Sequence, residues 1–280
     1  MSIFQEKIAF ENRFSQETKQ LIVLTSKTTG GASKAGKEKL WIASQRVIAY
    51  IDEKTGEFYQ SPARLEWQIK ETKNKIFDFG GHKIYKVLVR PELSDNKTSN
   101  ALHYFMLIDL IEENSHQLLN DFLEQYLKPV NLNYQDIIFT LNKEYNECEA
   151  NYQFLDKEIS IYLNCDDFDN NQEINLNSYL KILDNILNNK KDFDDLCKKF
   201  ACQELLKDAQ NWQEDGEEND LINDNQFIKR ISINSISLGN NSFEVFYDDD
   251  DIFWGHAIVV YGEILDNFCD INFINATIQG

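Results

Sequence analysis

Hydrophobic and polar residues alternate along several stretches of this chain with the period of two that indicates half-buried β-strands. The clearest stretch is 65–71, in which Leu65, Trp67 and Ile69 would face a core while the intervening polar residues face solvent. Other stretches are apolar or rich in β-branched and aromatic residues, which also predicts strands. They cover residues 21–25, 40–52, 83–90 and 102–111.

A helical period replaces this pattern at residues 115–127. Ser115 is the predicted N-cap, and Pro129 is expected to end the helix. We therefore predict an N-terminal domain, residues 1–130, in which antiparallel strands are closed by one helix. The apolar stripe of that helix consists of Leu118, Leu119, Phe122, Leu123, Tyr126 and Leu127.

The rest of the chain shows a strand pattern at 157–165, followed by helical stripes at 177–188 and 192–209. Asp194 and Asp195 lie in the first turn of the second helix, where they suit the positive end of the helix dipole. The stripe of this helix consists of Phe193, Leu196, Cys197, Phe200, Ala201, Leu205 and Ala209.

Further strands at 230–239 and 243–265 complete a second domain, residues 131–280. The strands and helices come in separate runs instead of alternating as βα units. The predicted fold class is therefore α+β in two parts, each a mainly antiparallel sheet with one or two packed helices.

The acidic charge is concentrated in the second half. The formal net charge is −19, from 28 basic and 47 acidic side chains. Residues 1–140 hold 18 of each, so the remaining 10 basic and 29 acidic side chains all belong to residues 141–280. Such a surface repels nucleic acid and anionic membranes and attracts a basic protein partner. Solubility alone is the other interpretation of this charge.

The stretch 243–265 predicts a β-hairpin with four consecutive aspartates, Asp248–Asp251, between its strands. Aspartate tolerates the left-handed conformations of tight turns, so a solvated turn is the first interpretation. A hard-cation site that includes His256 is the second, because such ions bind converging carboxylates. Gly255, between Trp254 and His256, predicts either a bulge in the second strand or the close approach of another backbone, and both fit a structural role for this triplet.

Residues 31–37 match the G-x4-G-K spacing of a phosphate-binding loop. The next residue is Glu38, where Mg²⁺ binding needs a hydroxyl, and the following segment predicts a strand in place of a helix. We therefore interpret the segment as a basic loop between strands. Its positive side chains, which could contact an acidic surface, are Lys27, Lys34, Lys37 and Lys39.

Most catalytic and metal-binding signatures are missing from the sequence, including HExxH, GxSxG and GxGxxG. No cofactor or metal is predicted, and Trp41, Trp67 and Trp212 are interpreted as core or loop-anchoring residues. The first residues carry charge where a signal peptide needs an apolar run, so a cytoplasmic protein with reduced thiols is expected. Its cysteines are Cys148, Cys165, Cys197, Cys202 and Cys269, with no CxxC pair.

Five segments resemble an uncharacterised bacterial family of domains of unknown function that ends in an FWGH-type hairpin. They are 36–41 (GKEKLW), 65–67 (LEW), 198–206 (KKFACQELL), 211–215 (NWQED) and 247–260 (YDDDDIFWGHAIVV). The resemblance implies no catalytic residues. By analogy, small acidic bacterial α+β proteins of this kind often neutralise toxins in competition between bacteria.

The leading hypothesis is a cytoplasmic immunity protein, not an enzyme, that neutralises a basic toxin effector through acidic loops. One alternative is a metal-dependent hydrolase that uses Asp248–Asp251 and His256, and another is a non-catalytic housekeeping binding protein. The predicted partner-binding residues are Asp166, Asp167, Asp169, Glu214, Asp215, Glu217, Glu218, Asp248, Asp249, Asp250 and Asp251.

Overall fold

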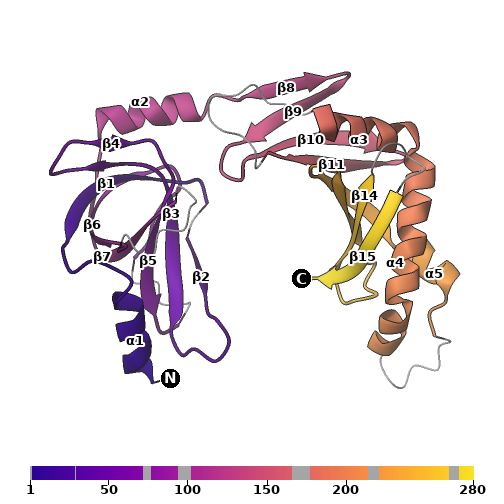
Figure 1. The fold of residues 1–280 in the computed structure, drawn as a ribbon, viewed down its shortest axis with the longest axis horizontal. Helices are drawn as coiled ribbons and strands as arrows, with labels where there is room; N and C mark the ends of the chain where they lie inside the picture. The colour runs from indigo at the N-terminus through magenta and orange to yellow at the C-terminus, as the bar shows by residue number, and fades with distance from the viewer. Residues whose placement is uncertain are drawn as a thin grey trace. The chain divides into compact units, whose positions relative to one another are not determined.

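The structure is a computed structural model that describes residues 2–28, 30–71, 77–93, 102–165, 177–213, 221–264 and 271–280. The chain divides into two compact units, Met1–Lys128 and Pro129–Gly280. Each unit is built on a large sheet, and the described residues form only five helices (Figure 1). The predicted division into two sheet-rich parts is confirmed. The predicted α+β class has to be corrected, because the protein is mostly β with few helices.

The first unit contains a closed β-barrel. Its strands are β1 (Lys19–Thr25), β2 (Gly31–Ser33), β3 (Trp41–Asp52), β4 (Phe58–Tyr59), β5 (Ala63–Ile69), β6 (Ile84–Pro91) and β7 (His103–Glu113). They follow the order β1-β6-β7-β5-β3, and β3 pairs back with β1 to close the ring. All neighbours are antiparallel except β5 and β7, which are parallel, while β2 and β4 pair with β3.

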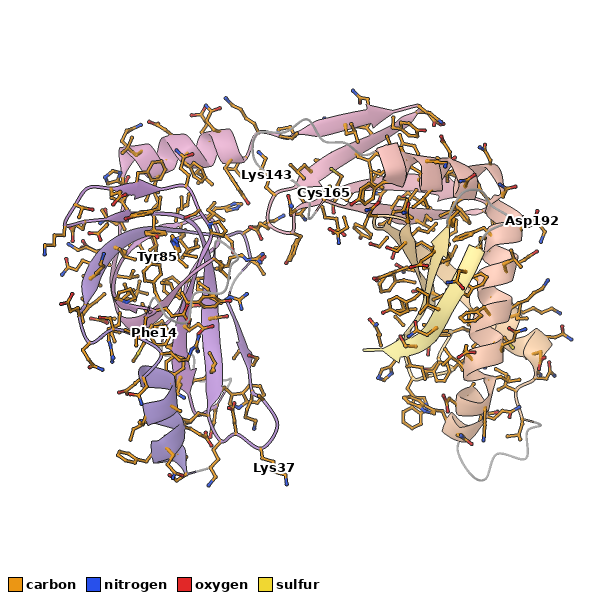
Figure 2. The ribbon with its side chains drawn as sticks, in the orientation of Figure 1. Phe14, Lys37, Tyr85, Lys143, Cys165 and Asp192 are labelled. Atoms are coloured by element: carbon orange, nitrogen blue, oxygen red, sulfur yellow. The ribbon has the colours of Figure 1, made fainter. Side chains whose placement is uncertain are left out.

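Both faces of β1 are buried along residues 21–25. Leu21 and Val23 point into the barrel, where they join Leu65 and Trp67 of β5 in one apolar cluster. Figure 2 shows side chains filling the barrel interior around Tyr85. Residues 21–24 form a continuous apolar run because neither face of the strand meets water there.

Helix α2 (Gln117–Tyr126) covers the outer face of the barrel. Its Leu119 is fully buried with Ile22 and Leu24 of β1, and the partly buried helix residues are Phe122, Leu123 and Tyr126. The predicted stripe was too wide, because Leu118 and Leu127 are exposed. The N-cap is His116, without a side-chain capping bond, and not Ser115.

Helix α1 (Ile3–Glu11) was not predicted, although a capping box between Ser2 and Gln5 begins it. Phe10 and Phe14, at and just after its end, are buried with ring centroids 5.3 Å apart. Figures 1 and 2 show α1 and Phe14 at one end of the barrel. The helix thereby covers the apolar side chains at that end.

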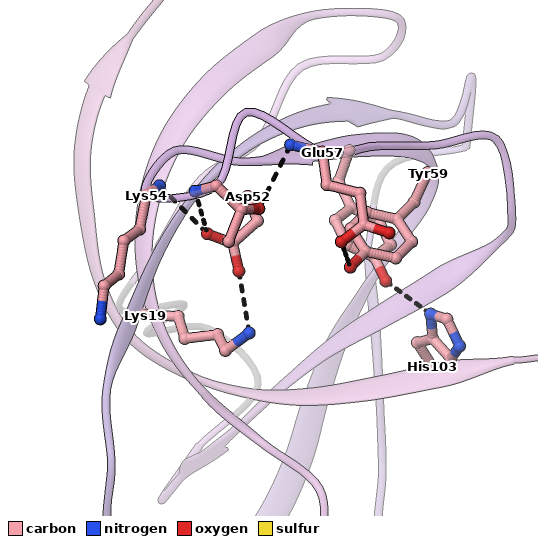
Figure 3. A network of polar contacts seen from close by, with 8 residues as sticks. Lys19, Asp52, Lys54, Glu57, Tyr59 and His103 are labelled. Carbon is pink, nitrogen blue, oxygen red and sulfur yellow. Dashed lines mark hydrogen bonds and ion pairs between the residues drawn. The ribbon is translucent and has the colours of Figure 1, made fainter.

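The turn between β3 and β4 is held by charge (Figure 3). The Asp52 carboxylate accepts hydrogen bonds from Lys19 Nζ at 2.8 Å and from the Lys54 backbone N–H at 3.0 Å. Nearby, the Tyr50 hydroxyl lies 2.5 Å from His103 Nδ1, and its ring stacks on Tyr59 at 4.6 Å. These contacts tie β3 to β1, β4 and β7 and explain His103 structurally.

The second unit is an eight-stranded mixed sheet with helices on one face. In sheet order the strands are β15 (Ile271–Gln279), β14 (Ala257–Ile264), β13 (Ser242–Asp248), β12 (Ser232–Leu238), β11 (Lys157–Asn164), β10 (Glu147–Phe154), β9 (Ile137–Asn142) and β8 (Asn131–Tyr134). Only β11 and β12 pair in parallel, because the three helices intervene between them.

Helices α3 (Asn177–Asn188), α4 (Lys190–Trp212) and α5 (Asp224–Arg230) pack on this sheet. The α4 stripe is confirmed at Phe193, Cys197 and Ala201, whereas Leu196 is exposed. Asp194 does more than suit a dipole: it is buried and accepts a hydrogen bond from the fully buried Tyr247 hydroxyl at 3.0 Å. Its other oxygen lies 2.9 Å from Lys198 Nζ.

Candidate functional site: the tryptophan pocket

The turn between β13 and β14 has an unusual backbone. Asp250, Asp251, Trp254 and Gly255 all have positive φ, at 48°, 62°, 58° and 84°. Non-glycine residues rarely adopt this region, and bulky ones do so only when the surrounding structure imposes it. Gly255 therefore belongs to the turn, and the prediction of a bulge within the second strand was wrong. The predicted close approach of another backbone was wrong too, because a Cβ at Gly255 would meet none of the described residues beyond its chain neighbours within 4 Å.

The Asp249 carboxylate imposes the turn. One oxygen accepts the backbone N–H of Asp251 at 3.2 Å, and the other accepts those of Phe253 at 2.6 Å and Gly255 at 3.3 Å. The residue is only 4% exposed. Three charge-assisted bonds from backbone donors fix the path of the chain, so Asp249 is a structural residue and not a surface charge.

The other three aspartates differ from one another. Asp248 lies 2.8 Å from Lys157 Nζ and accepts Asn234 Nδ2 at 2.9 Å. Asp250 lies 2.9 Å from Arg230 Nε and also binds this guanidinium through its backbone carbonyl. The exposed Asp251 carboxylate contacts no charged or donor group among the described residues. Only Asp251 therefore offers its negative charge to a ligand.

The turn sends neighbouring side chains in opposite directions. Phe253 is completely buried, whereas Trp254 is 63% exposed. The Trp254 indole leans on Trp212 at the end of α4, with ring centroids 4.9 Å apart. Trp212 also contacts the rings of Phe253 and His256 edge-on, at 5.5 and 5.4 Å.

An open pocket of about 290 Å³ lies beside Trp212 and Trp254, and we call it the tryptophan pocket. Its wall is partly aromatic and partly charged. The lining residues are Ala209, Trp212, Gln213, Ile222, Arg230, Asp251, Ile252 and Trp254.

The electrostatics of the tryptophan pocket favour a cation. The charge of Arg230 is balanced by Asp250, which leaves the Asp251 carboxylate uncompensated. The last turn of α4, which ends at Trp212, contains no basic residue that would offset the partial negative charge of the helix C-terminus. Indole faces attract ammonium and guanidinium groups through their quadrupole.

The sequence located half of this site. Asp251 was singled out as a partner-binding residue, but Trp254 was given a structural role, Trp212 was interpreted as a core or loop anchor, and Arg230 was not considered. The available signal was the resemblance itself, because the segments containing Trp212 and Trp254 were both part of it. The remaining predicted acidic residues, Asp166, Asp167, Asp169, Glu214, Asp215, Glu217 and Glu218, lie outside the described residues, as does Cys269.

The metal-dependent hydrolase and the phosphate-binding loop find no support in the contacts of the described residues. The Asp249 oxygens already accept backbone bonds, and His256 Nδ1 lies 2.5 Å from the Phe253 carbonyl, to which it donates. Across the described part of the chain, no three His, Cys, Asp or Glu side chains gather as metal ligands do. Lys37, in the loop between β2 and β3, points away from the barrel and no helix follows it (Figure 2).

The four cysteines in the described ranges, Cys148, Cys165, Cys197 and Cys202, are free thiols and are all buried. Desolvation raises the pKa of Cys197 and Cys202. A raised pKa keeps a thiol protonated and unreactive. These two residues therefore behave as small apolar core residues.

Residues 138–273 match a family described as "Uncharacterized protein conserved in bacteria (DUF2262)". Residues 6–126 match a second one, described as "Domain of unknown function (DUF7021)". The resemblance to a bacterial family of unknown function is thereby confirmed for the second unit, which contains the tryptophan pocket. No curated protein and no solved structure matches the chain. In the ranges that the structure describes, none of the helices has the length and apolar character needed to span a bilayer.

Proposed function

We propose that this protein is a non-catalytic binding protein whose second unit holds a basic side chain of a protein partner in the tryptophan pocket. The observation that carries the proposal is the conformation of Trp254. Its backbone is left-handed and its indole is 63% exposed. The fold places a large aromatic ring in solvent on a left-handed backbone, and residues with such strained backbones cluster at functional sites.

The chemistry of the pocket supports a lysine or arginine as the bound group. A cation within roughly 6 Å of an indole face is attracted by the ring, and two indoles are available here. The Asp251 carboxylate supplies a charged acceptor at the rim of the same pocket. Tryptophan and arginine are also the residues most enriched among the energetic hot spots of protein interfaces.

The charge of the whole second half supports a basic partner. Residues 141–280 carry 29 acidic and 10 basic side chains. Long-range attraction of this kind accelerates encounter with a positively charged protein, most strongly at low salt. The tryptophan pocket would then provide the short-range contact that the diffuse charge lacks.

The specific role we propose is immunity: the protein binds a toxin effector in the cytoplasm and blocks it. Support comes from the concentrated acidic charge, from a sequence without familiar catalytic motifs and from the match to a family conserved in bacteria. The acidic segments at 166–173 and 214–224 remain part of this proposal as secondary contacts.

Site-specific photo-crosslinking tests the proposal. Benzoylphenylalanine is placed at position 254, and at position 145 as a control, because Tyr145 is a similarly exposed aromatic residue of the same unit. We expect position 254 alone to capture a protein of high isoelectric point in the host bacterium. Equal capture from both positions, or none from 254, would argue against the tryptophan pocket as the interface.

A growth assay tests the immunity role separately. Cells that produce a toxin encoded beside this gene should survive when they also produce the wild-type protein or the Tyr145→Ala variant. Trp254→Ala should protect poorly. Full protection by Trp254→Ala at equal protein level would contradict the role of the pocket, and no protection by the wild type would contradict immunity against that toxin.

A further inference from the structure

A second pocket lies in the first unit, where α1 meets the strands of the barrel (Figure 1). It has a volume of about 200 Å³ and a half-open mouth. Pockets for drug-sized ligands span roughly 300–1,000 Å³, so this one suits a ligand of few atoms. Its apolar wall consists of Ala9, Phe10, Leu40 and Ile42, and its polar wall includes Glu6 and Gln68.

Glu6 is the unusual feature of this pocket. It is only 6% exposed, and its Oε2 accepts the backbone N–H groups of Lys39 and Leu40, both at 3.0 Å. Its Oε1 is buried and has no hydrogen-bond partner among the described residues. A buried carboxylate oxygen without a donor is costly, and a ligand that donates a hydrogen bond would remove that cost.

Neighbouring charges select the sign of the ligand. Arg13 also lines the pocket, but its guanidinium lies 2.9 Å from Glu66 and 3.7 Å from Glu92, so two carboxylates offset its charge. Glu38, which is exposed, adds negative charge to the pocket lining.

We infer that this pocket binds a small primary ammonium group on a short aliphatic chain. The ammonium would donate to Glu6 Oε1, and the aliphatic chain would lie against Phe10, Leu40 and Ile42. The three donors of an ammonium allow it to reach the Gln68 amide as well. An anion is disfavoured by Glu6 and Glu38, and a neutral apolar molecule would leave Glu6 Oε1 without a donor.

Titration of the full-length protein with n-butylammonium, followed by amide NMR, tests this inference. The N–H groups of Lys39 and Leu40 report directly on Glu6, because they donate to its carboxylate. We expect saturable shifts of these two resonances with n-butylammonium, weaker shifts with 1-butanol, whose hydroxyl donates without a charge, and none with butyrate. Equal shifts with 1-butanol, a response to butyrate in place of the amine, or no saturation would overturn the inference.

Glu6→Gln provides the matched variant. Its amide oxygen can still accept from Lys39 and Leu40, while its NH₂ group places a donor where the ligand needs an acceptor. We expect binding to weaken roughly 10- to 100-fold, as for the loss of a charged hydrogen bond. Glu11→Gln makes the same charge change at an exposed position of α1 and should bind as the wild type does. Undiminished binding by Glu6→Gln would refute the site.

Discussion

The indole of Trp254 packs against the indole of Trp212, with 4.9 Å between ring centroids and 51° between ring planes. Trp212 ends α4, and Trp254 lies in the turn between β13 and β14. Trp212 is partly buried and contacts the rings of Phe253 and His256, whereas Trp254 projects into solvent. The pair joins a rigid anchor to an exposed surface, an arrangement that suits recognition better than core packing.

Substitutions of the adjacent residues Phe253 and Trp254 should distinguish a core residue from a surface residue. Trp254→Ala should cost no more than about 1.5 kcal/mol, because the exposed ring loses only its contact with Trp212. Phe253→Ala, at a fully buried position, should cost about 3–5 kcal/mol. Urea unfolding followed by circular dichroism measures both. A cost above about 2 kcal/mol for Trp254→Ala would mean that the ring is part of the core.

Substitutions of Asp249 and Asp251 should also differ in their effect on stability, although the two residues belong to the same acidic run. Asp249→Ala removes the acceptor of three backbone N–H groups in a buried turn and should cost about 2–4 kcal/mol. Asp251→Asn removes the exposed charge, keeps a residue type that tolerates the positive φ of this position, and should be nearly neutral for stability. Similar values for the two variants would contradict the structural role of Asp249. A charge-reversal test of partner binding therefore belongs at Asp251.

The buried Tyr247 should depend on Asp194. Burial, above all, raises the pKa of Tyr247 far above its usual value, so the hydroxyl stays protonated and donates. Tyr247→Phe leaves one buried oxygen of Asp194 without its donor and should cost about 1–3 kcal/mol in chemical denaturation. Tyr261→Phe, at a half-exposed position of β14, is the control and should stay within about 0.5 kcal/mol. An equally small effect at Tyr247 would refute the coupling.

Asp52 should make the stability of the barrel depend on pH. The hydrogen bond from Lys19 lowers the pKa of Asp52 below its ordinary value of 3.8. A depressed folded-state pKa means that the stabilisation is present above the unfolded value and is lost as the pH falls through the folded one. Asp52→Asn should therefore cost about 1–2 kcal/mol at neutral pH and progressively less below about pH 5.

Thermal or urea unfolding of wild type and Asp52→Asn between neutral and acidic pH measures this difference. Because other carboxylates titrate in both proteins, only the difference between the two curves reports on Asp52. A difference that stays constant or grows as the pH falls would contradict the assigned contacts.

Local sequence patterns predicted most strands and helices but not their connections. The alternation at Leu65, Trp67 and Ile69 identified β5, and the stripes at 177–188 and 192–209 identified α3 and most of α4. Barrel closure by β1 and the parallel pairs β5–β7 and β11–β12 depend on contacts between distant segments. No local period encodes such contacts, so they could not be read from the sequence.

The elements that were missed and the stripe residues that are exposed have separate causes. Helix α1 was overlooked although Ser2 and Gln5 form a capping box, and β8, which was also missed, begins directly after the predicted domain boundary at residue 130. Leu118 and Leu196 continue their helical stripes but are exposed, because each helix contacts its sheet along a narrower face than the pattern suggests.

The candidate site shows the same division between local and distant information. The run Asp248–Asp251 correctly indicated a turn. Its sequence did not reveal that Asp249 is buried while Asp251 is exposed, because that difference arises from the left-handed backbone of the turn. The approach of Trp212 and Arg230 depends on how α4 and α5 pack on the sheet.

The affinity of the captured partner for Trp254→Ala, compared with the wild type, tests the central claim most directly. Isothermal titration calorimetry on the purified pair, with Tyr145→Ala as the control, provides the comparison. A hot-spot residue contributes at least about 2 kcal/mol, so Trp254→Ala should bind at least ~30-fold more weakly while Tyr145→Ala stays near the wild-type value. A Trp254→Ala affinity within about twofold of the wild type would contradict the tryptophan pocket as the binding site.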